Sequence, residues 1–461
     1  MRRRNIVLGC ILLPLALTSC SQEPVADDVG EMLSVDFATY LSHSTTMEAT
    51  AGTSRSAVAS FFVSGASTRA ATPYYNIETV GDLRQTGFGV MAYATGSHDY
   101  VTGQTAFLPN FMYNQLVSYD GGTSSWTYSP TVYWPEDKVS FFAYAPYRGQ
   151  ASERFLAMND STDFAKGNSH AGDPSLTYAV AASPMNSVDL LWATQTSGQP
   201  WLNQTKPSVS SRLTFYFRHA LSKINLQAEY VAEKASDEDV SASANTLVLI
   251  ESIAVEGDGS LPASATLSLC NALASVPLWS RPSGSVRISV DDSSLDSRYV
   301  AGQVTDAASF LKLKEAGGGL PMIVDGATDK AVDVLAPVQS PAGNATTAAL
   351  MLIPTSATSA AASKLYVTVT YTIVTYDKDL AYNNPPYLVF TRHQRVSGTC
   401  TFDNGLVGGR AYNVRLKIGL HALRFQVDAD NWQEPVAFTP AVNPWTTGDG
   451  SDKHMTIDTT K

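Results

Sequence analysis

The chain has 461 residues, of which 44 % are hydrophobic and 16 % are charged, and its formal net charge is −11. At roughly 100–200 residues per domain, this length predicts two or three domains, and the hydrophobic content is sufficient for their cores. The excess of Asp and Glu over Lys and Arg excludes nucleic acid as a partner, because phosphate backbones are bound by clustered basic side chains. The many Tyr, Phe and Trp residues favour β-structure over helix or disorder.

The first 19 residues have the layout of a secretory signal. The basic residues Arg2–Arg4 precede an apolar run, Ile6–Leu17, that is too short for a transmembrane helix of about 20 residues. A small residue directly before a cysteine, here Ser19-Cys20, is typical of a bacterial lipobox, where cleavage leaves a thiol that carries lipid. We therefore predict a lipoprotein signal peptide over 1–19 and lipid attachment to Cys20. The alternative is an ordinary signal peptide with an incidental cysteine.

Two cysteines, Cys270 and Cys400, remain beyond the signal and Cys20. An exported protein meets an oxidising compartment, where a disulfide between them would stabilise the fold by roughly 4–5 kcal/mol. Two buried thiols explain the count equally well. The sequence has no CxxC motif and no Cys/His spacing typical of zinc, so we predict no metal.

The first half of the chain predicts one β-sandwich, over residues 35–211. Residues 20–34 are acidic and without period, as in a flexible spacer, and residues 43–80 are rich in Ser, Thr and Ala. Around them lie about seven short apolar or aromatic runs separated by turn residues, which is the usual strand number of one sandwich. The predicted strands are Asp36–Ser42, Gly87–Ala94, Phe111–Tyr119, Ser125–Trp134, Val139–Tyr147, Leu176–Ala181 and Val188–Thr194.

A Gly-, Pro- and Ser-containing linker at 195–211 precedes a second predicted β-sandwich over 212–434 and a tail over 435–461. Near its start the apolar residues change parity, from odd to even positions. Because the period of a strand is two, this predicts a bulge or break near His219–Ser222. The apolar positions are Leu213, Phe215 and Phe217 before the change, and Ile224, Leu226 and Ala228 after it.

Later in this half, Leu365–Ile373 and Tyr412–Leu420 alternate apolar with polar residues, which predicts half-buried antiparallel strands. The one helix that we predict is Asp306–Glu315, which three glycines follow. Its apolar side consists of Phe310, Leu311 and Leu313.

Motifs for catalysis are missing from the sequence. The seven histidines are scattered, and there is no HExxH, GxSxG, P-loop or GxGxxG motif. Asp428–Asn431 is similar to part of a calcium loop but lacks its glycine, so we interpret it as a turn. Two glycosidase carboxylates on distant strands stay an open alternative. We therefore predict neither an enzyme nor a cofactor.

A series of strings resembles one known family, the fimbrillin-like (Mfa-like) lipoproteins, which are type V pilins and their relatives in Bacteroidales-type bacteria. Each string is weak alone, but their order behind a lipobox is specific, and the match is poorest between 232 and 340. The strings are Gly87–Tyr93, Pro109–Gln115, Trp126–Pro130, Tyr133–Pro135, Val139–Tyr147, Asp189–Ala193, Phe217–Ile224, Tyr412–Leu420 and the ending at Trp432.

The resemblance implies two tandem transthyretin-like Greek-key β-sandwiches, exported to the outer membrane as a surface-exposed lipoprotein. It implies a subunit of a fimbria, or its anchor or tip, serving adhesion and biofilm formation. Other fimbrial subunits would be its partners, together with an unnamed ligand on a host or bacterial surface.

In polymerising members of this family, an arginine-specific protease removes the N-terminal segment with its first strand, and a C-terminal strand of another subunit fills the groove. Carried onto this chain, the cut would follow Arg69, or else Arg55, and the donor strand would contain Val436, Phe438 and Val442. The alternatives are a lipoprotein that is never cut and a plain frayed tail.

A second hypothesis is a monomeric surface lipoprotein that binds a glycan or host ligand without polymerising. Its sugar platforms would be aromatic residues such as Trp126, Trp134 and Trp201. Core packing is the simpler account of Trp126 and Trp134, because both lie within predicted strands.

Overall fold

A computed structural model of the chain describes twelve segments, which are mostly β-strand, as predicted. No helix in these segments is both long and apolar enough to cross a membrane. The predicted signal peptide, Cys20, Arg55, Arg69, Trp432 and the donor segment lie outside the described residues. Those are 33–41, 76–101, 108–148, 156–158, 172–195, 199–207, 212–231, 245–270, 278–323, 331–355, 362–419 and 423–431.

The first sheet has eight strands in the order β1-β10-β8-β5-β2-β3-β4, with β9 on β5. Its central strands β2 and β5 are buried along nearly their whole length, so both faces of the sheet are covered. This burial explains why their sequences are continuous apolar runs rather than alternating ones. The strands are β1 (Asp36–Leu41), β2 (Phe88–Ala94), β3 (Met112–Asp120), β4 (Ser125–Thr127), β5 (Val139–Ala145), β8 (Leu191–Thr194), β9 (Trp201–Gln204) and β10 (Arg212–His219).

Two more sheets face each other across a single core and form a sandwich. One is β16-β11-β23-β24, with β17 and β20 also paired to β11. It comprises β11 (Ser222–Val231), β16 (Met322–Ile323), β17 (Val332–Asp333), β20 (Leu350–Leu352), β23 (Arg410–Ile418) and β24 (Leu423–Asn431). The other, β15-β12-β21-β22, comprises β12 (Thr246–Gly257), β15 (Arg287–Val290), β21 (Ser363–Tyr376) and β22 (Leu388–Phe402).

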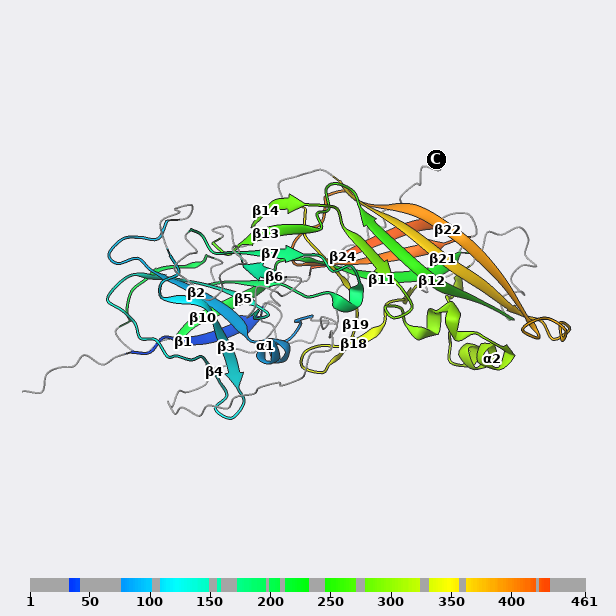
Figure 1. The fold of residues 1–461 in the computed structure, drawn as a ribbon, viewed down its shortest axis with the longest axis horizontal. Coiled ribbons are helices and arrows are strands. Elements are labelled where there is room, and N and C mark those ends of the chain that lie inside the picture. Colours follow the sequence, from blue (N-terminus) through cyan, green and yellow to red (C-terminus); the bar gives the residue numbers. More distant parts are fainter. Residues whose placement is uncertain are drawn as a thin grey trace, which may run out of the picture.

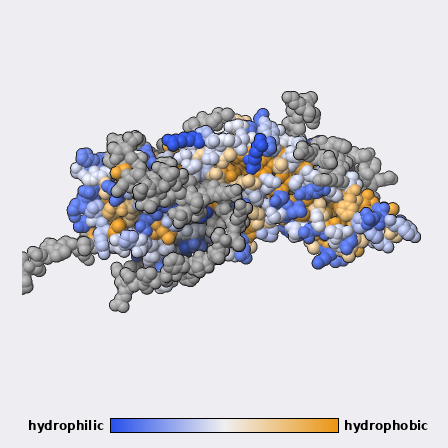
Figure 2. All heavy atoms as spheres, in the orientation of Figure 1, coloured by the Kyte–Doolittle hydropathy of each residue, from blue (hydrophilic) through white to orange (hydrophobic). Residues whose placement is uncertain are grey.

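A fourth sheet, β14-β13-β7-β6, packs on the first sheet through a cluster that joins Tyr93, Phe142 and Trp192 to Tyr178 and Leu267. Figure 1 shows it between the first sheet and the β12–β21–β22 sheet, which lie at opposite ends of an elongated molecule. In Figure 2, apolar side chains gather right of centre, over the region of β11, β12 and β24. The strands of the fourth sheet are β6 (Leu156–Met158), β7 (Ser175–Ala179), β13 (Ser264–Ser268) and β14 (Leu278–Ser283).

The predicted change of parity is the point where the chain passes from one sheet to another. β10 ends at His219 in the first sheet, and β11 begins at Ser222 in the second, with the fully buried Ala220 and Leu221 between them. β10 lies after residue 211, the predicted domain boundary, but belongs to the first sheet. β7 lies before residue 211 but pairs with β13, which lies after it. Strand pairing crosses residue 211 in both directions, and the division into two tandem domains there stays a prediction.

The two cysteines lie in different core clusters, Cys270 beside the fourth sheet and Cys400 in the sandwich. Both are buried thiols, and no disulfide joins them. Burial raises the pKa of Cys400 to about 12, because a thiolate there would lose its solvation. Of the two explanations for the cysteine count, two buried thiols describe this structure.

Glycines in the string Gly87–Tyr93 are needed for close packing and for a turn. Gly87 has φ 62° and ends α1 (Val80–Thr86), and a Cβ on Gly89 would lie 2.4 Å from the ring of Tyr144. That ring is held by its hydroxyl, which donates to Asn114 Oδ1 at 2.7 Å. The string therefore marks a place where an aromatic ring packs against bare backbone.

The predicted helix at 306–315 is confirmed as α2 (Ala307–Glu315), with Asp306 as its N-cap. Phe310 is fully buried as expected, whereas Leu311 is 44 % exposed, so its assignment to the apolar side was wrong. The expectation of a single helix was also wrong, because α1 is a second one. Its seven residues contain few apolar positions, and its signal is the capping box Thr79–Asp82. The remaining described elements are β18 (Pro337–Gln339), β19 (Ala345–Thr347) and 3₁₀ turns at Pro184–Asn186, Ser297–Tyr299 and Ala301–Gln303.

We predict that Asp82 contributes far more to the free energy of unfolding than an ordinary helix N-cap does. Its fully buried carboxylate accepts hydrogen bonds from the Thr79 N–H at 2.9 Å and, across the molecule, from the Ala342 N–H at 2.9 Å. Asp82→Ala should lower the free energy of unfolding in urea by about 2–4 kcal/mol, since it removes a cap and strands buried donors. Asp306→Ala, which removes the exposed cap of α2, is the matched control and should cost about 1 kcal/mol. Equal losses in the two variants would contradict this prediction.

Candidate assembly site

The predicted first strand is confirmed as β1, and it lies at the edge of the first sheet. It pairs in parallel with β10, from Asp36 opposite Arg212 to Leu41 opposite Phe217, and Figure 1 shows the two strands side by side. On the other side of its N-terminal end, the Val35 N–H donates to the Val132 carbonyl at 3.1 Å, and the Trp134 N–H donates to the Leu33 carbonyl at 2.9 Å. The segment 33–41 is thus held between β10 and residues 132–134.

Two side chains of this segment fill an aromatic slot. Val35 is fully buried and Phe37 is 4 % exposed. The Phe37 ring stacks on Phe215 at a centroid distance of 5.6 Å and lies 5.4 Å from Tyr128. Phe88 and Phe141 close the slot, with centroids 6.3 Å from that of Phe37. Since alternate residues of a strand share a face, Val35 and Phe37 enter the slot together.

The hydroxyl of the partly buried Tyr128 also holds the strand. The Tyr128 hydroxyl donates to the Val35 carbonyl at 2.7 Å. Burial raises the pKa of Tyr128 to about 12, so the phenol keeps its proton and its donor role at neutral pH. The strand is therefore attached by backbone pairing, by the hydroxyl of Tyr128 and by its own side chains of Val35 and Phe37.

The described chain resumes at Asn76, and there it is fastened to the junction between β10 and β11. The Ile77 N–H donates to Asp189 Oδ2 at 3.3 Å, and the same carboxylate oxygen lies 2.9 Å from His219 Nδ1. Both side chains of this Asp189–His219 pair are fully buried. The next residue, Glu78, forms an ion pair with Lys223 near the start of β11. These contacts hold the chain from residue 76 onward independently of β1.

Glu78 stays ionised in this position. Burial disfavours its charged form, but the Lys223 ammonium, with hydrogen bonds from Lys223 and Asn76, outweighs that effect and holds the pKa of Glu78 below its ordinary value of 4.5. No motif in the sequence predicts this cluster, although Asp189 and His219 each lie in a string that carried the resemblance.

The tryptophans considered as sugar platforms belong to the core around the slot. Trp134 is 7 % exposed, the Trp126 ring lies 5.0 Å from Phe88, and the Trp201 indole N–H donates to the Thr214 carbonyl at 3.0 Å. Core packing accounts for all three. The interpretation of 428–431 as a turn was wrong, because these residues continue β24 in antiparallel pairing with β23. No group of three His, Cys, Asp or Glu side chains in the described segments is arranged to hold a metal ion.

Comparisons with known proteins give one consistent result. A family model described as fimbrillin-like matches residues 68–445. The fimbrium subunit Fim1C of Phocaeicola vulgatus is 32 % identical over 142 residues, which are 30 % of this chain and 35 % of the relative, so the match spans about a third of that protein. The crystal structure of a fimbrial protein from Bacteroides vulgatus has the same fold, with a TM-score of 0.52 and 20 % identity over 78 % of this chain and 97 % of that one.

Phe37 is predicted to be the main attachment of β1. Phe37→Ala should lower the stability of the strand by about 3–5 kcal/mol, because it leaves a cavity among four aromatic rings. Hydrogen exchange of the β1 amides is the measurement, and exchange in the variant should be faster by orders of magnitude. Asp36→Ala, on the opposite face of the same strand, is the control and should leave exchange nearly unchanged. Similar acceleration in both variants would show that backbone pairing, rather than the slot, holds β1.

The ion pair of Glu78 predicts a pH dependence. A lowered carboxyl pKa contributes stability above the ordinary value of 4.5, and this contribution is lost as the pH falls through the lowered pKa of the folded protein. Glu78→Gln should therefore lower the melting temperature at neutral pH, and its difference from the wild type should shrink as the pH falls below that ordinary value. If the difference in melting temperature between Glu78→Gln and the wild type does not change with pH, the charge of Glu78 does not stabilise the fold. Glu136→Gln, at an exposed ion pair with Lys206, is the control.

Proposed function

The chain belongs to the fimbrillin-like family, and from this premise we propose that it is a structural subunit, anchor or tip of a cell-surface fimbria that serves adhesion and biofilm formation. The observation that carries the proposal is the slot at the edge of the first sheet. It is filled by a strand whose side chains are buried like those of a core, yet the strand is joined to the rest of the chain through residues 42–75, which contain Arg55 and Arg69.

We propose that the chain reaches the outer membrane with lipid on Cys20 and is then cut after Arg69, or after Arg55. Either cut would separate β1 from Asn76 and all that follows. Departure of β1 would expose the aromatic rings of Phe88, Phe141 and Phe215 together with the free edge of β10. An apolar slot beside unpaired backbone donors and acceptors favours the insertion of a new strand.

The C-terminal segment has the pattern that the slot requires. Val436 and Phe438 repeat the spacing of Val35 and Phe37, with valine and phenylalanine two residues apart in both segments. Residues at that spacing point to the same face of a strand, so Phe438 of one subunit would take the place of Phe37 in the next. Pro440 limits the pairing beyond Thr439, because proline has no N–H to donate. Val442 lies beyond this limit and would make a lesser contribution.

Such an exchange builds a filament. The slot and the donor segment are different surfaces of one chain, so each contact is heterologous and leaves one slot and one donor unused at the two ends. Repetition of a contact that does not close into a ring gives a linear polymer. A subunit that keeps its own β1 would accept no donor, and it would terminate or anchor the fimbria instead.

The test is the N-terminus and intact mass of the protein taken from its own outer membrane. We expect a start at Ala70, or at Ser56 if the cut follows Arg55. If Arg69 is the site, Arg69→Ala should keep a lipidated Cys20 start and abolish polymers on denaturant-free gels. Arg55→Ala is then the matched control and should polymerise normally, and the two variants exchange roles if the wild type starts at Ser56. A Cys20 start on all wild-type molecules would contradict the proposed processing and favour an uncut anchor or a monomeric lipoprotein.

A second variant separates cutting from exchange. Phe438→Asp should be cut at the same bond but should not polymerise, because a carboxylate cannot enter the aromatic slot without a partner. Polymers of normal length from this variant would exclude Val436–Val442 as the donor strand.

A further inference from the structure

The outward face of β11 and β23 is a ladder of paired polar side chains. The two strands run in parallel, with Asn225 opposite Asn413 and Gln227 opposite Arg415. The Asn225 amide donates to Asn413 Oδ1 at 2.9 Å, and Arg415 Nε donates to Gln227 Oε1 at 3.2 Å. Because each side chain is oriented by the one across from it, this face is ordered before any ligand arrives.

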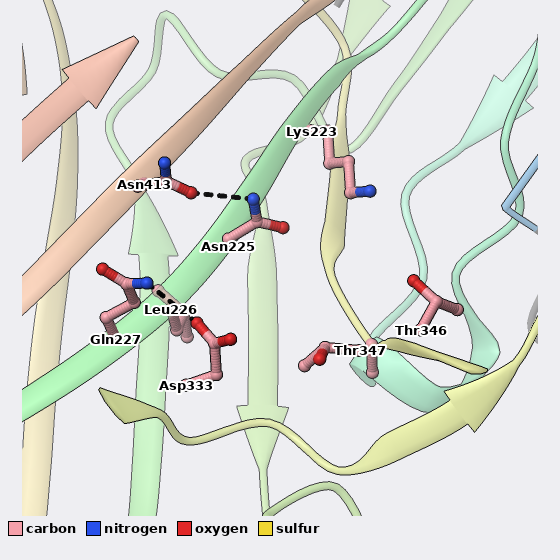
Figure 3. Close-up of a pocket in the computed structure, with 9 residues that line it drawn as sticks. Lys223, Asn225, Leu226, Gln227, Asp333, Thr346, Thr347 and Asn413 are labelled. Atoms are coloured by element: carbon pink, nitrogen blue, oxygen red, sulfur yellow. Dashed lines mark hydrogen bonds between the residues drawn. The ribbon is translucent and has the colours of Figure 1, made fainter. Parts of the chain in front are cut away.

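A pocket of about 300 Å³ lies over this ladder. It forms because β11 pairs with β20 at Ser222–Ile224 and with β17 at Gln227–Ala228, and the chain between these two strands turns away to form the β18–β19 hairpin. Asp333 of β17 and Thr346 and Thr347 of β19 supply the walls. Figure 3 shows oxygen atoms of Asn225, Asp333 and Thr347 turned toward the same space.

The charges of the pocket disfavour ionic ligands. The Lys223 ammonium at one end is paired with Glu78, so it does not supply an uncompensated positive charge for a phosphate or carboxylate. Asp333 is the carboxylate among the described lining residues, and one of its oxygens already accepts from Gln227 at 2.9 Å. A single carboxylate is a poor site for a metal cation.

The pocket also exposes little apolar surface. Leu226 and Ala348 contribute to the walls but are 2 % and 1 % exposed, so they offer a ligand little hydrophobic area. What the pocket offers is a dense set of amide, hydroxyl and carboxylate groups. A sugar hydroxyl both donates and accepts, so vicinal hydroxyls can satisfy such a mixed set of groups. We propose that this pocket binds one unit of a neutral glycan.

The proposal also predicts a weak monomeric site. No aromatic ring stands among the described lining residues, so the sugar gains no stacking, and its affinity should lie in the millimolar range. Many copies of the pocket along one filament would convert that weak affinity into strong attachment through avidity. This last step rests on the proposed fimbrial function, whereas binding by a single chain does not.

The experiment measures binding to an assembly-deficient full chain that carries Arg69→Ala. The probes are polyacrylamide conjugates of β-galactose, α-mannose and N-acetyl-β-glucosamine, with a β-glucuronate conjugate for comparison, applied to the immobilised protein. At least one neutral conjugate should bind and be displaced by its free methyl glycoside. Asn225→Leu and Thr347→Val should each weaken that binding by about tenfold or more, as expected when hydrogen bonds to the ligand are lost.

Thr370→Val is the matched control, since it makes the same change on β21, outside the pocket. It should leave binding unchanged, and equal melting temperatures of all variants would confirm that they fold. The proposal is overturned if no neutral conjugate binds, if binding survives both pocket variants, or if glucuronate binds more tightly with the same dependence on Asn225. A Thr347→Val variant that keeps Arg69 tests the fimbrial function separately. If it forms normal polymers but does not bind the glycan, assembly does not depend on this pocket.

Discussion

The attachment of β1 to its slot is the interaction on which the proposed assembly depends. An edge strand leaves one row of backbone groups without a ladder partner, and proteins normally cover or blunt such an edge. Here β1, a strand of six residues, covers the edge of β10. Its Phe37 is buried among Phe88, Tyr128, Phe141 and Phe215. Loss of β1 would expose these apolar side chains to water, and in the proposed assembly another strand takes its place. This property suits a subunit that is stable before assembly and becomes bound after it.

The junction at Ala220–Leu221 connects that slot to the rest of the molecule. β10 borders the slot, and only Ala220 and Leu221 separate it from β11 of the sandwich. The Gly409 N–H donates to the Leu221 carbonyl at 2.7 Å. β24 ends beside this point, with Asn431 opposite Arg410. The Asp189–His219 pair and the Glu78–Lys223 pair fasten the segment after residue 75 to the same junction. The slot and the junction are therefore linked through β10 and through the buried Asp189–His219 pair.

The two faces of β11 differ, because alternate residues of a strand point to opposite sides. Ile224, Leu226 and Ala228 face the sandwich core, while Asn225, Gln227 and the buried Glu229 lie on the opposite face of the strand, in register with residues of β23. The paired residues on that face include Lys417 with Glu229, at 3.6 Å between charged atoms. Because the partners are fixed across parallel strands, the outer face has a definite chemistry rather than a fluctuating one. The polar pocket arises where the neighbouring strands leave that face uncovered.

The sequence by itself determined the β-class, the family, β1, helix α2 and the break between β10 and β11, because each depends on local pattern: apolar period, capping residues or a change of parity. It did not reveal helix α1, whose roughly two turns are stabilised by a hydrogen bond from the Ala342 N–H to the Asp82 carboxylate. Nor did it show that β7 pairs with β13, or that the two cysteines lie in separate clusters. Only the tertiary structure decided which aromatic residues surround Phe37 and which polar residues meet over β11. Those neighbours come from strands far apart in the chain, and period and propensity carry no information about which strands will lie side by side.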